Sequence, residues 1–227
     1  MMQTSFDKSI ADIIDLGISE YREAYNVQRE ILRKRLSGII DDTVIITEHK
    51  PVFTISRLGS KENLLATSDE IKDKGIELIE IDRGGDITFH GPGQLVMYPI
   101  IDLKGYSRDI HEYIRRLEEV VIDFLLVYDI KGFRVPGASG VWVGKNLKIA
   151  SVGISIKRWT TYHGISVNVN IPLHYFDMIV PCGLKRCKAV SIASLLKKPA
   201  DIQAAKSRLT DSFKKVFRIW RDRPWSK

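Results

Sequence analysis

A cysteine between a proline and a glycine is the first residue of this sequence whose type and setting favour chemistry. Cys182 lies in the segment Pro181-Cys182-Gly183, and proline and glycine both favour turns, where a substrate can reach the sulfur. A thiolate stabilised by nearby cations is a nucleophile. Cys187 follows after four residues rather than two, a spacing that fits neither a C-x-x-C redox pair nor a paired zinc knuckle. A small buried cysteine without chemistry is the alternative interpretation.

A lysine in a strand-like segment is the second candidate. Hydrophobic residues dominate the segment from Leu147 to Ile156, and Lys148 shares the parity of Ala150, Val152 and Ile154. Side chains of equal parity in a strand project to the same face, so Lys148 is expected to point to the apolar side. Burial lowers the pKa of a lysine unless an anion lies beside it, and such a lysine suits acid and base catalysis. The alternative is a strand-end lysine that extends to water.

Four glycines and a proline within twelve residues mark a loop that can line a pocket. The segment from Arg83 to Gln94 contains Gly84-Gly85 and Gly91-Pro92-Gly93. Paired glycines let a ligand approach the backbone closely, and Gly-Pro-Gly favours a tight turn. The segment matches neither the Walker pattern nor G-x-G-x-x-G, so a phosphate site is not indicated, and a surface turn is the alternative. The candidate residues are Arg83, Gly84, Gly85, Asp86, Ile87, Thr88, Phe89 and His90.

Hydrophobic periodicity predicts the elements that must position these residues. Strands are predicted at 43–49, 51–56, 76–81, 95–101, 141–143, 147–156 and 165–171. Helices are predicted at 19–36, 107–128 and 201–220, and Thr67 with Glu70 forms a capping box for a shorter helix. The regular βαβ rhythm of a doubly wound sheet is missing. The pattern therefore predicts an α+β fold, with a mixed and largely antiparallel sheet flanked by helices, in one domain over residues 1–227.

Positive charge is concentrated at the C-terminal end of the chain. The 227 residues include 35 Lys and Arg and 28 Asp and Glu, and the segment from residue 197 onward holds ten of the basic and three of the acidic residues. The whole net charge of +7 therefore lies in the predicted helix 201–220 and its flanks. This amphipathic helix is expected to present Lys206, Lys214 and Arg218 outward. Such a face attracts acidic partners, although a solvated helix face is the plain alternative.

Composition and spacing exclude several classes of protein. The longest apolar run, from Phe124 to Tyr128, is far shorter than the roughly 20 residues of a membrane-spanning helix, and charged residues interrupt the N-terminal positions that a signal peptide would need. Two cysteines exclude a disulfide scaffold, so a cytoplasmic location is expected. The histidines lack H-E-x-x-H spacing, and we expect no metal. Phe217 and Trp220 lie on the apolar stripe, so nucleic acid is not an expected partner, and the short apolar runs argue against a membrane.

The candidate segments occur in an order that resembles the lipoyl(octanoyl) transferase family, and the likeness covers nearly the whole chain. The matching segments are Asp15-Leu16-Gly17 with Tyr21 and Gln28, Glu48-His49-Lys50-Pro51-Val52-Phe53-Thr54, the Arg83 to Gln94 loop, Gly140-Val141-Trp142-Val143, Lys148-Ile149-Ala150-Ser151-Val152-Gly153, Tyr162-His163-Gly164-Ile165-Ser166-Val167-Asn168 and Pro181-Cys182-Gly183. Ser56 stands where the family usually has glycine, and Val190-Ser191-Ile192 replaces a common Thr-Ser pair. These departures concern contacts with substrate rather than the activity.

The resemblance implies an acyl transfer through a covalent intermediate. The family moves an octanoyl group from octanoyl-acyl carrier protein to a lysine of lipoyl domains, in lipoate biosynthesis. It implies that Cys182 carries the acyl group as a thioester, that Lys148 is its acid and base partner, and that no cofactor is required. It also implies a fold like the catalytic domain of biotin and lipoate protein ligases. The residues it places around the acyl chain are Arg83 to His90, Ser151, Val152, Gly153, Gly164, Ile165 and Ser166.

Two other functions stay open at this point. An ATP-dependent lipoate or biotin protein ligase has a similar glycine-rich loop and lysine. Such an enzyme activates a free acid as an adenylate and needs no nucleophilic cysteine, so Pro181-Cys182-Gly183 favours the transferase. A nucleic-acid-binding protein is the distant alternative, and only the basic C-terminal segment supports it. That segment also suits acidic carrier proteins and lipoyl domains, which it could steer toward the site.

Overall fold

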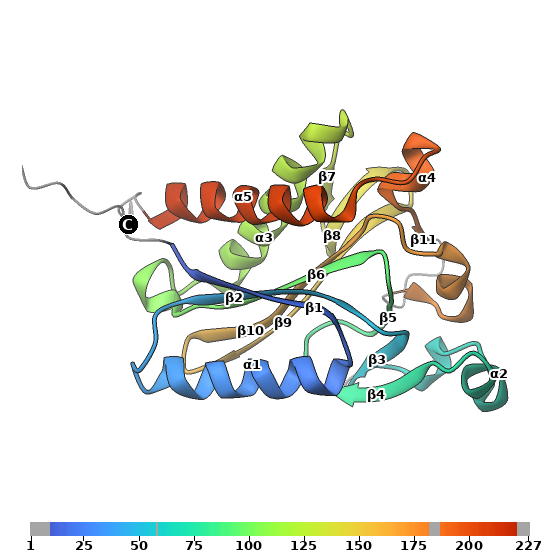
Figure 1. The fold of residues 1–227 in the computed structure, drawn as a ribbon, viewed down its shortest axis with the longest axis horizontal. Helices are drawn as coiled ribbons and strands as arrows, with labels where there is room; N and C mark the ends of the chain where they lie inside the picture. The colour runs from blue at the N-terminus through green and yellow to red at the C-terminus, as the bar shows by residue number, and fades with distance from the viewer. Residues whose placement is uncertain (1–9, 58, 182–186, 222–227) are drawn as a thin grey trace, which may run out of the picture.

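An eight-stranded sheet forms the centre of the protein. The computed structural model describes residues 10–57, 59–181 and 187–221 (Figure 1). The strands follow the order β1, β2, β6, β10, β9, β8, β7, and β11 pairs with β9 off this path. Their bounds are β1 (Asp12–Ser19), β2 (Thr43–His49), β6 (Gln94–Ile100), β7 (Phe133–Val135), β8 (Ala138–Gly144), β9 (Leu147–Lys157), β10 (Thr160–Asn168) and β11 (Lys188–Ala189). Only the β1–β2 and β11–β9 pairs are parallel, so within the described residues the sheet is mixed and largely antiparallel, as predicted.

A three-stranded sheet holds both ends of the glycine-rich loop. Its central strand β3 (Val52–Ser56) pairs in parallel with β4 (Glu77–Ile81) and antiparallel with β5 (Ile87–His90). Because β4 and β5 lie on opposite sides of β3, the chain between them must cross the end of this sheet. Phe53 and Phe89 are fully buried in its core, with ring centroids 5.3 Å apart.

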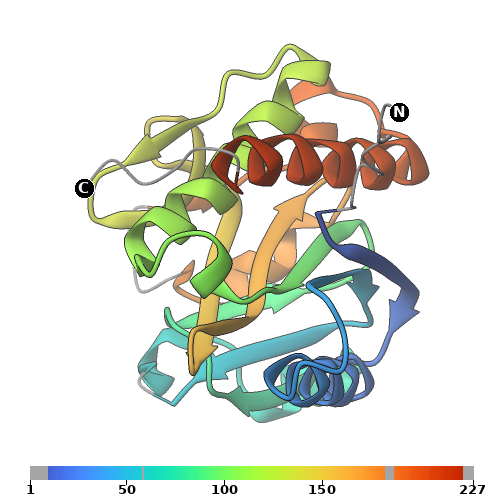
Figure 2. The same ribbon diagram turned by 90° about the vertical axis from the view of Figure 1, so that its left-hand side faces the viewer.

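Helices cover both faces of the large sheet. α1 (Tyr21–Leu36) lies on one face, and α3 (Ile110–Leu125) and α5 (Ile202–Arg221) lie together on the opposite face (Figures 1 and 2). The shorter elements are α2 (Ser68–Asp73), α4 (Ile192–Leu196), η1 (Lys61–Asn63), η2 (Leu103–Gly105), η3 (Leu126–Tyr128) and η4 (Leu173–Met178). Phe124 of α3 and Phe213 of α5 are fully buried in the core that these two helices share with the sheet. In the described ranges, no helix is long and apolar enough to span a membrane.

Capping residues explain where two of the helices begin. The Asp109 side chain accepts hydrogen bonds from the backbone N–H groups of His111 and Glu112, at 2.8 and 3.1 Å, and α3 begins directly after it. Such caps satisfy N–H groups that have no partner inside the helix. The predicted capping box is present at α2, where Thr67 and Glu70 bond reciprocally. Local sequence thus determines these two helix starts.

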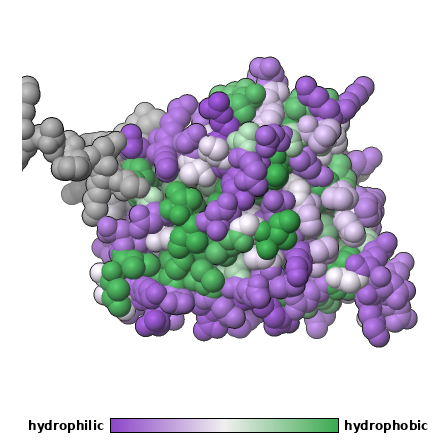
Figure 3. Space-filling model, viewed as in Figure 1, coloured by the Kyte–Doolittle hydropathy of each residue, from purple (hydrophilic) through white to green (hydrophobic). Residues whose placement is uncertain are grey.

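The edge strand β1 is one of several elements that the periodicity did not predict, along with β7, β11 and α4. Asp12, Asp15 and Gly17 interrupt its apolar residues, and its register with β2 shifts between Asp15 and Ile18. The strand consequently lacks a regular alternation, and α1 begins at Tyr21 rather than at residue 19. The side chains of β1 remain partly accessible to solvent, and Ile18 is 57% exposed. Apolar side chains gather on this face of the protein (Figure 3).

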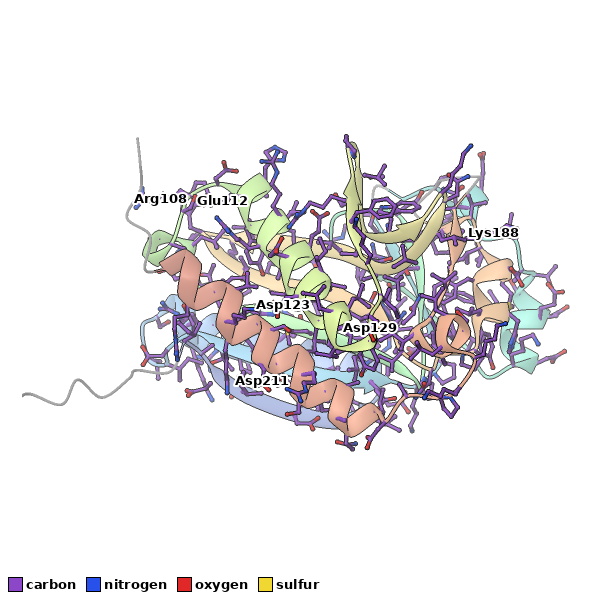
Figure 4. The ribbon with its side chains drawn as sticks, turned by 90° about the horizontal axis from the view of Figure 1, so that it is seen from above. Arg108, Glu112, Asp123, Asp129, Lys188 and Asp211 are labelled. Carbon is purple, nitrogen blue, oxygen red and sulfur yellow. The ribbon has the colours of Figure 1, made fainter. Side chains whose placement is uncertain are left out.

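Ion pairs within the fold use part of the positive charge of α5. Lys206, expected on the outer face, is buried instead, because its Nζ lies 2.9 and 3.0 Å from the carboxylate oxygens of Asp15. Lys215 of α5 pairs with Asp123, which is carried by the neighbouring helix α3 (Figure 4). Arg218 is exposed, as predicted, whereas the side chain of Trp220 lies outside the described part of the chain. The basic face of α5 is therefore smaller than its composition indicates.

The turn after β5 requires a glycine, and this requirement can be tested. Gly93 has φ +87°, and a Cβ at this position would lie 2.7 Å from the backbone of Asn170 and Ile171. We expect Gly93→Ala to lower the free energy of unfolding by about 2 kcal/mol or more, measured by urea denaturation. Gly105→Ala is the matched control, because its Cβ would have open space, and it should change stability by less than about 0.5 kcal/mol. Equal stability of the two variants would contradict this account of the turn.

Candidate active site

Two adjoining pockets meet at β9. The first, which we call the inner pocket, has about 460 Å³ of empty space, and the second, which we call the lysine pocket, has about 670 Å³. Gly85, Val152 and Gly153 line both pockets. The lysine pocket takes its name from Lys148, and three small residues, Gly137 in the turn before β8 and Ala138 and Ser139 at the start of β8, form part of its wall. A ligand that occupies both pockets would pass over the shared residues.

The structure brings most of the predicted site residues together. Those that line the inner pocket are Arg83, Gly85, Asp86, Ile87, Thr88, His90, Ser151, Val152, Gly153, Gly164, Ile165 and Ser166. Gly84 lines the lysine pocket. Phe89 lies elsewhere, because its ring is buried in the core of the small sheet and stacks on Tyr175 at 4.5 Å between centroids. Alternation in β5 explains this placement, since Thr88 and His90 share one face of the strand and Phe89 occupies the other.

The prediction missed four residues that line the inner pocket. These are Tyr21, Val96, Tyr98 and His163. Tyr21 and His163 belong to segments that resemble the transferase family, and their presence there was the available signal. Val96 and Tyr98 lie in β6, where apolar residues alone indicate only a buried strand. The pocket is therefore assembled from more of the chain than the glycine-rich loop and two strands.

The half of β9 that is not paired with β8 positions the glycine-rich loop. β10 pairs with β9 along most of its length, placing Ser151 opposite Ser166 and Gly153 opposite Gly164. β8 pairs with β9 only over Leu147 to Ala150, and beyond that point Gly84 N–H donates to Ile154 O at 2.8 Å. The loop thereby continues the hydrogen bonding of the strand edge. Both pockets are consequently lined by the loop and by β9.

Hydrogen bonds to the small sheet fix the conformation of this loop. Arg83 Nη2 donates to the backbone oxygen and to Oγ1 of Thr54, at 2.8 and 3.0 Å, and Arg83 Nη1 donates to Gly84 O at 3.0 Å. The hydroxyl of Ser56 donates to Gly85 O at 2.7 Å. Ser56, which departs from the glycine of the transferase family, therefore adds a bond that holds the glycine pair in place.

Three aromatic side chains donate hydrogen bonds to a carboxylate at the start of the loop. Asp82 accepts hydrogen bonds from Tyr25 OH at 2.8 Å, Tyr162 OH at 2.7 Å and His163 Nε2 at 3.1 Å. The bond from His163, with those from the two tyrosines, holds the pKa of Asp82 well below its usual range. Burial lowers the pKa of His163 despite the nearby carboxylate. The arrangement ties α1 and β10 to the residue before Arg83.

Two buried histidines, His90 in the wall of the inner pocket and His49 behind it, are uncharged. Burial lowers the pKa of His49 to about 4 and that of His90 to about 3, so both rings are uncharged near pH 7. His90 Nδ1 lies 2.6 Å from Gln94 Oε1, and His49 Nε2 lies 2.7 Å from Tyr98 OH. Within the described residues, no group of three or more His, Cys, Asp and Glu side chains could hold a metal ion. The uncharged ring of His90 makes this part of the wall suitable for an apolar ligand.

Lys148 projects into the interior, as its parity in the strand predicted. Its side chain is buried, with 5% of the residue exposed, so the alternative of a lysine extending to water is wrong. The amine nitrogen lies 5.4 Å from the centroid of the Trp142 ring. Burying an amine is costly unless it is compensated. Lys148 is therefore a candidate for acid and base chemistry.

The nucleophile predicted from the sequence, Cys182, lies outside the described residues, and so does Gly183. The chain on the far side of this segment returns to the strand that carries Lys148. In β11, Lys188 pairs with Leu147 and Ala189 with Lys148, in parallel. Val190 N–H then donates to Lys148 O at 3.0 Å. The residues that follow the Pro-Cys-Gly segment are thus anchored beside Lys148.

Comparison with known sequences gives one consistent result. The family model of the lipoyl protein ligase A/B catalytic domain matches residues 20–214. Proteins named octanoyltransferase from Solibacter usitatus and Rubrobacter xylanophilus are 42% and 43% identical to this chain over 202 and 203 residues. These matches cover 89% and 88% of the chain and 90% of each relative.

Comparison with solved structures confirms the predicted class of fold. A bipartite lipoate protein ligase from Thermoplasma acidophilum superposes with a TM-score of 0.71 at 15% identity, covering 92% of this chain and 84% of that chain. A biotin protein ligase from Aquifex aeolicus, in complex with biotin and ATP, gives a TM-score of 0.57 at 13% identity, covering 93% and 72%. At these identities the likeness concerns the fold alone.

The neutral histidines predict a loss of stability in acid. Below about pH 6.5 the unfolded chain binds protons at His49 and His90, whereas the folded chain does not until the pH approaches their lowered pKa values. The free energy of unfolding, measured in urea, should therefore fall from about pH 6.5 toward pH 4. In His90→Gln this decline should be shallower by up to about 1.4 kcal/mol per pH unit. The exposed His174→Gln serves as control, and parallel curves for all three proteins would refute the explanation.

Proposed function

The chain belongs to the lipoyl protein ligase A/B catalytic domain family and is an octanoyltransferase, and we propose that it uses Cys182 and Lys148 to transfer the octanoyl group. The proposed donor is octanoyl-acyl carrier protein and the proposed acceptor is a lysine of lipoyl domains. The observation that carries this proposal is the buried Lys148, whose pocket joins the inner pocket at shared residues. An acid and base group at this junction could serve a thioester whose acyl chain occupies the inner pocket.

The first half-reaction exchanges one thioester for another. The Cys182 thiolate attacks the carbonyl carbon of the donor, and the bond between that carbon and the carrier sulfur breaks. The departing sulfur takes a proton from Lys148 Nζ. Because the ammonium form of Lys148 would stabilise the thiolate before the attack, one residue both activates the nucleophile and protonates the leaving group. The two thioesters are nearly equal in free energy, so no ATP is required.

The second half-reaction forms an amide. The acceptor lysine attacks the acyl carbon held on Cys182, a C–N bond forms, and the C–S bond breaks. Lys148, now a neutral amine, takes the proton that the acceptor nitrogen loses. This step restores the ammonium beside a cysteine thiolate, which is the starting state. The greater stability of the amide drives the overall transfer.

The inner pocket suits the alkyl part of the substrate. Val96, Val152 and Ile165 supply apolar surface, and the neutral His90 adds no charge at physiological pH. Burial of each methylene contributes about 0.8 kcal/mol. Affinity for the donor should therefore increase with chain length until the pocket is filled.

An ATP-dependent ligase is the closest alternative, because the fold is shared with such enzymes. The two activities differ in what they consume. Incubation with octanoyl-acyl carrier protein and a lipoyl domain, without ATP, should yield octanoylated lipoyl domain by intact mass spectrometry. An absolute requirement for ATP and free octanoic acid would favour the ligase. Binding of duplex DNA with a steep salt dependence, without any acyl adduct, would favour the distant alternative of a nucleic-acid-binding protein.

The covalent intermediate provides the test of the nucleophile. With octanoyl-acyl carrier protein alone, the protein should gain about 126 Da, one octanoyl group, in an adduct that hydroxylamine removes. Cys182→Ala should abolish the adduct, because it removes the sulfur that bears the thioester. Cys187→Ala is the matched control and should keep it. The opposite pattern would place the nucleophile at Cys187.

The role of Lys148 is tested by a substitution that retains charge. Lys148→Arg keeps a cation beside the cysteine, but a guanidinium does not release its proton at neutral pH. We expect a faint acyl adduct and a turnover number at least about 100-fold lower, measured as octanoylated lipoyl domain over time. Turnover near that of the wild type would remove Lys148 from the proposed mechanism.

A further inference from the structure

Glu118 is a buried carboxylate that has no part in the proposed reaction. It lies on α3, and its side chain is only 7% exposed. Its Oε1 accepts a hydrogen bond from the backbone N–H of Gly140 in β8 at 2.9 Å, and its Oε2 lies 3.2 Å from Arg134 Nε. Burying a carboxylate is costly unless hydrogen bonds and an opposite charge compensate it. Glu118 therefore occupies its position because of the particular groups that it contacts.

The residue that Glu118 holds is in direct contact with Lys148. Gly140 has φ +119°, a conformation that other residues rarely adopt. A Cβ at Gly140 would lie 2.5 Å from Lys148 Cε, 3.2 Å from Lys148 Nζ and 2.4 Å from Ala150 O. The amine end of Lys148 thus occupies the space that a side chain at position 140 would need.

β8 limits the position of the amine at two places. Trp142 pairs with Lys148 across the strands, and its ring centroid lies 5.4 Å from Nζ. The indole is held in turn by a hydrogen bond from Nε1 to Ala138 O at 3.1 Å. Gly140 lies between Ala138 and Trp142 in β8, and its backbone N–H donates the hydrogen bond to Glu118. A shift of Gly140 would therefore change the position of the lysine side chain.

We propose that Glu118 is a positioning residue for the acyl transfer, because it holds Gly140 and thereby keeps the amine of Lys148 at the junction of the two pockets. The inference rests on the proposed function of Lys148. Ile114, one turn earlier on α3, lines the lysine pocket. The same helix thus contributes one wall of this pocket and the carboxylate that fixes the opposite strand.

Three substitutions of glutamate test this role in the full-length enzyme. Glu118→Met removes the acceptor for Gly140 N–H, and kcat for octanoyl transfer to the lipoyl domain should fall about tenfold or more, since small displacements of catalytic groups are costly. The KM for octanoyl-acyl carrier protein should stay within about twofold, because the inner pocket is unchanged. Glu118→Gln keeps an acceptor oxygen and should retain kcat within about threefold. Glu119→Met is the control, since Glu119 also pairs with Arg134, at 2.6 Å, but is bonded to no residue of β8 in the described structure.

A second variant tests the contact between Gly140 and Lys148 directly. Gly140→Ala leaves Glu118 intact but places a methyl group against Lys148 Cε and the backbone oxygen of Ala150, so kcat should again fall about tenfold or more. If both changes act by displacing Lys148, the double variant Glu118→Met with Gly140→Ala should lose much less than the product of the two single losses. Should Glu118→Met or Gly140→Ala fail to fold in a thermal melt, Glu118→Asp decides the question by the same kinetic measurements, because its shorter side chain keeps the charge but withdraws the acceptor from Gly140 N–H, so a wild-type kcat would overturn the inference.

Several results would overturn the inference. A wild-type kcat in Glu118→Met or in Gly140→Ala would do so, and so would a Glu118→Gln variant as slow as Glu118→Met. An equal loss of kcat in Glu119→Met, or a kcat loss in the double variant equal to the product of the single losses, would also contradict it. Lys148→Arg separates this failure from failure of the proposed function. If Lys148→Arg is inactive while Glu118→Met is normal, only the positioning role is wrong. If Lys148→Arg keeps normal turnover, the proposed chemistry fails as well.

Discussion

The candidate site depends on the change of partner along one edge of β9. Over Leu147 to Ala150 that edge is paired with β8, and beyond this point it bonds to the glycine-rich loop through Gly84. Lys148 lies in the first half, with the wall of the inner pocket in the second half. Had β8 continued along the whole strand, the loop could not reach β9, and the two pockets would not share residues. The early end of this strand pairing is therefore what allows a buried amine and an apolar pocket to meet.

Charges in the site are distributed unequally between the two pockets. In the inner pocket His90 is kept neutral by burial, and the Arg83 guanidinium is bonded to Thr54 and Gly84 rather than projecting into empty space. The lysine pocket instead contains the buried amine of Lys148, which contacts Gly140, and the backbone N–H of Gly140 is bonded to the buried carboxylate of Glu118. Under the proposed reaction, this separation keeps apolar binding and proton transfer in adjacent but distinct surroundings.

Local patterns in the sequence predicted much of the fold and the inward direction of Lys148. The strand at 43–49 agrees with the bounds of β2, and the parity of Lys148 with Ala150 placed it correctly on the apolar side. Such predictions succeed because strand alternation is a property of neighbouring residues. The edge strand β1 escaped prediction because a bulge and two aspartates break its alternation.

Long-range contacts explain what the sequence left undetermined in the site. His163 has φ +56° and is fixed by Asp82, which lies 81 residues earlier in the chain. The role of Glu118 as an acceptor for Gly140 N–H likewise joins residues 22 positions apart. A glutamate among apolar residues of a helix indicates that something must pair with it, but helical spacing alone does not identify the partner. These pairings exist only after the helices have packed on the sheet.

The geometry of the lysine pocket also bears on how one site could serve two large protein substrates in turn. In the proposed mechanism both half-reactions occur at the same acyl carbon, so the acyl chain can stay in the inner pocket while the donor leaves and the acceptor enters. That exchange requires room beside Lys148, and the small residues Gly137, Ala138 and Ser139 line the lysine pocket. If both partners approach Lys148 past these residues, a bulky residue there obstructs the two half-reactions together. A change deep in the inner pocket should instead affect acyl-chain selection in the first half-reaction.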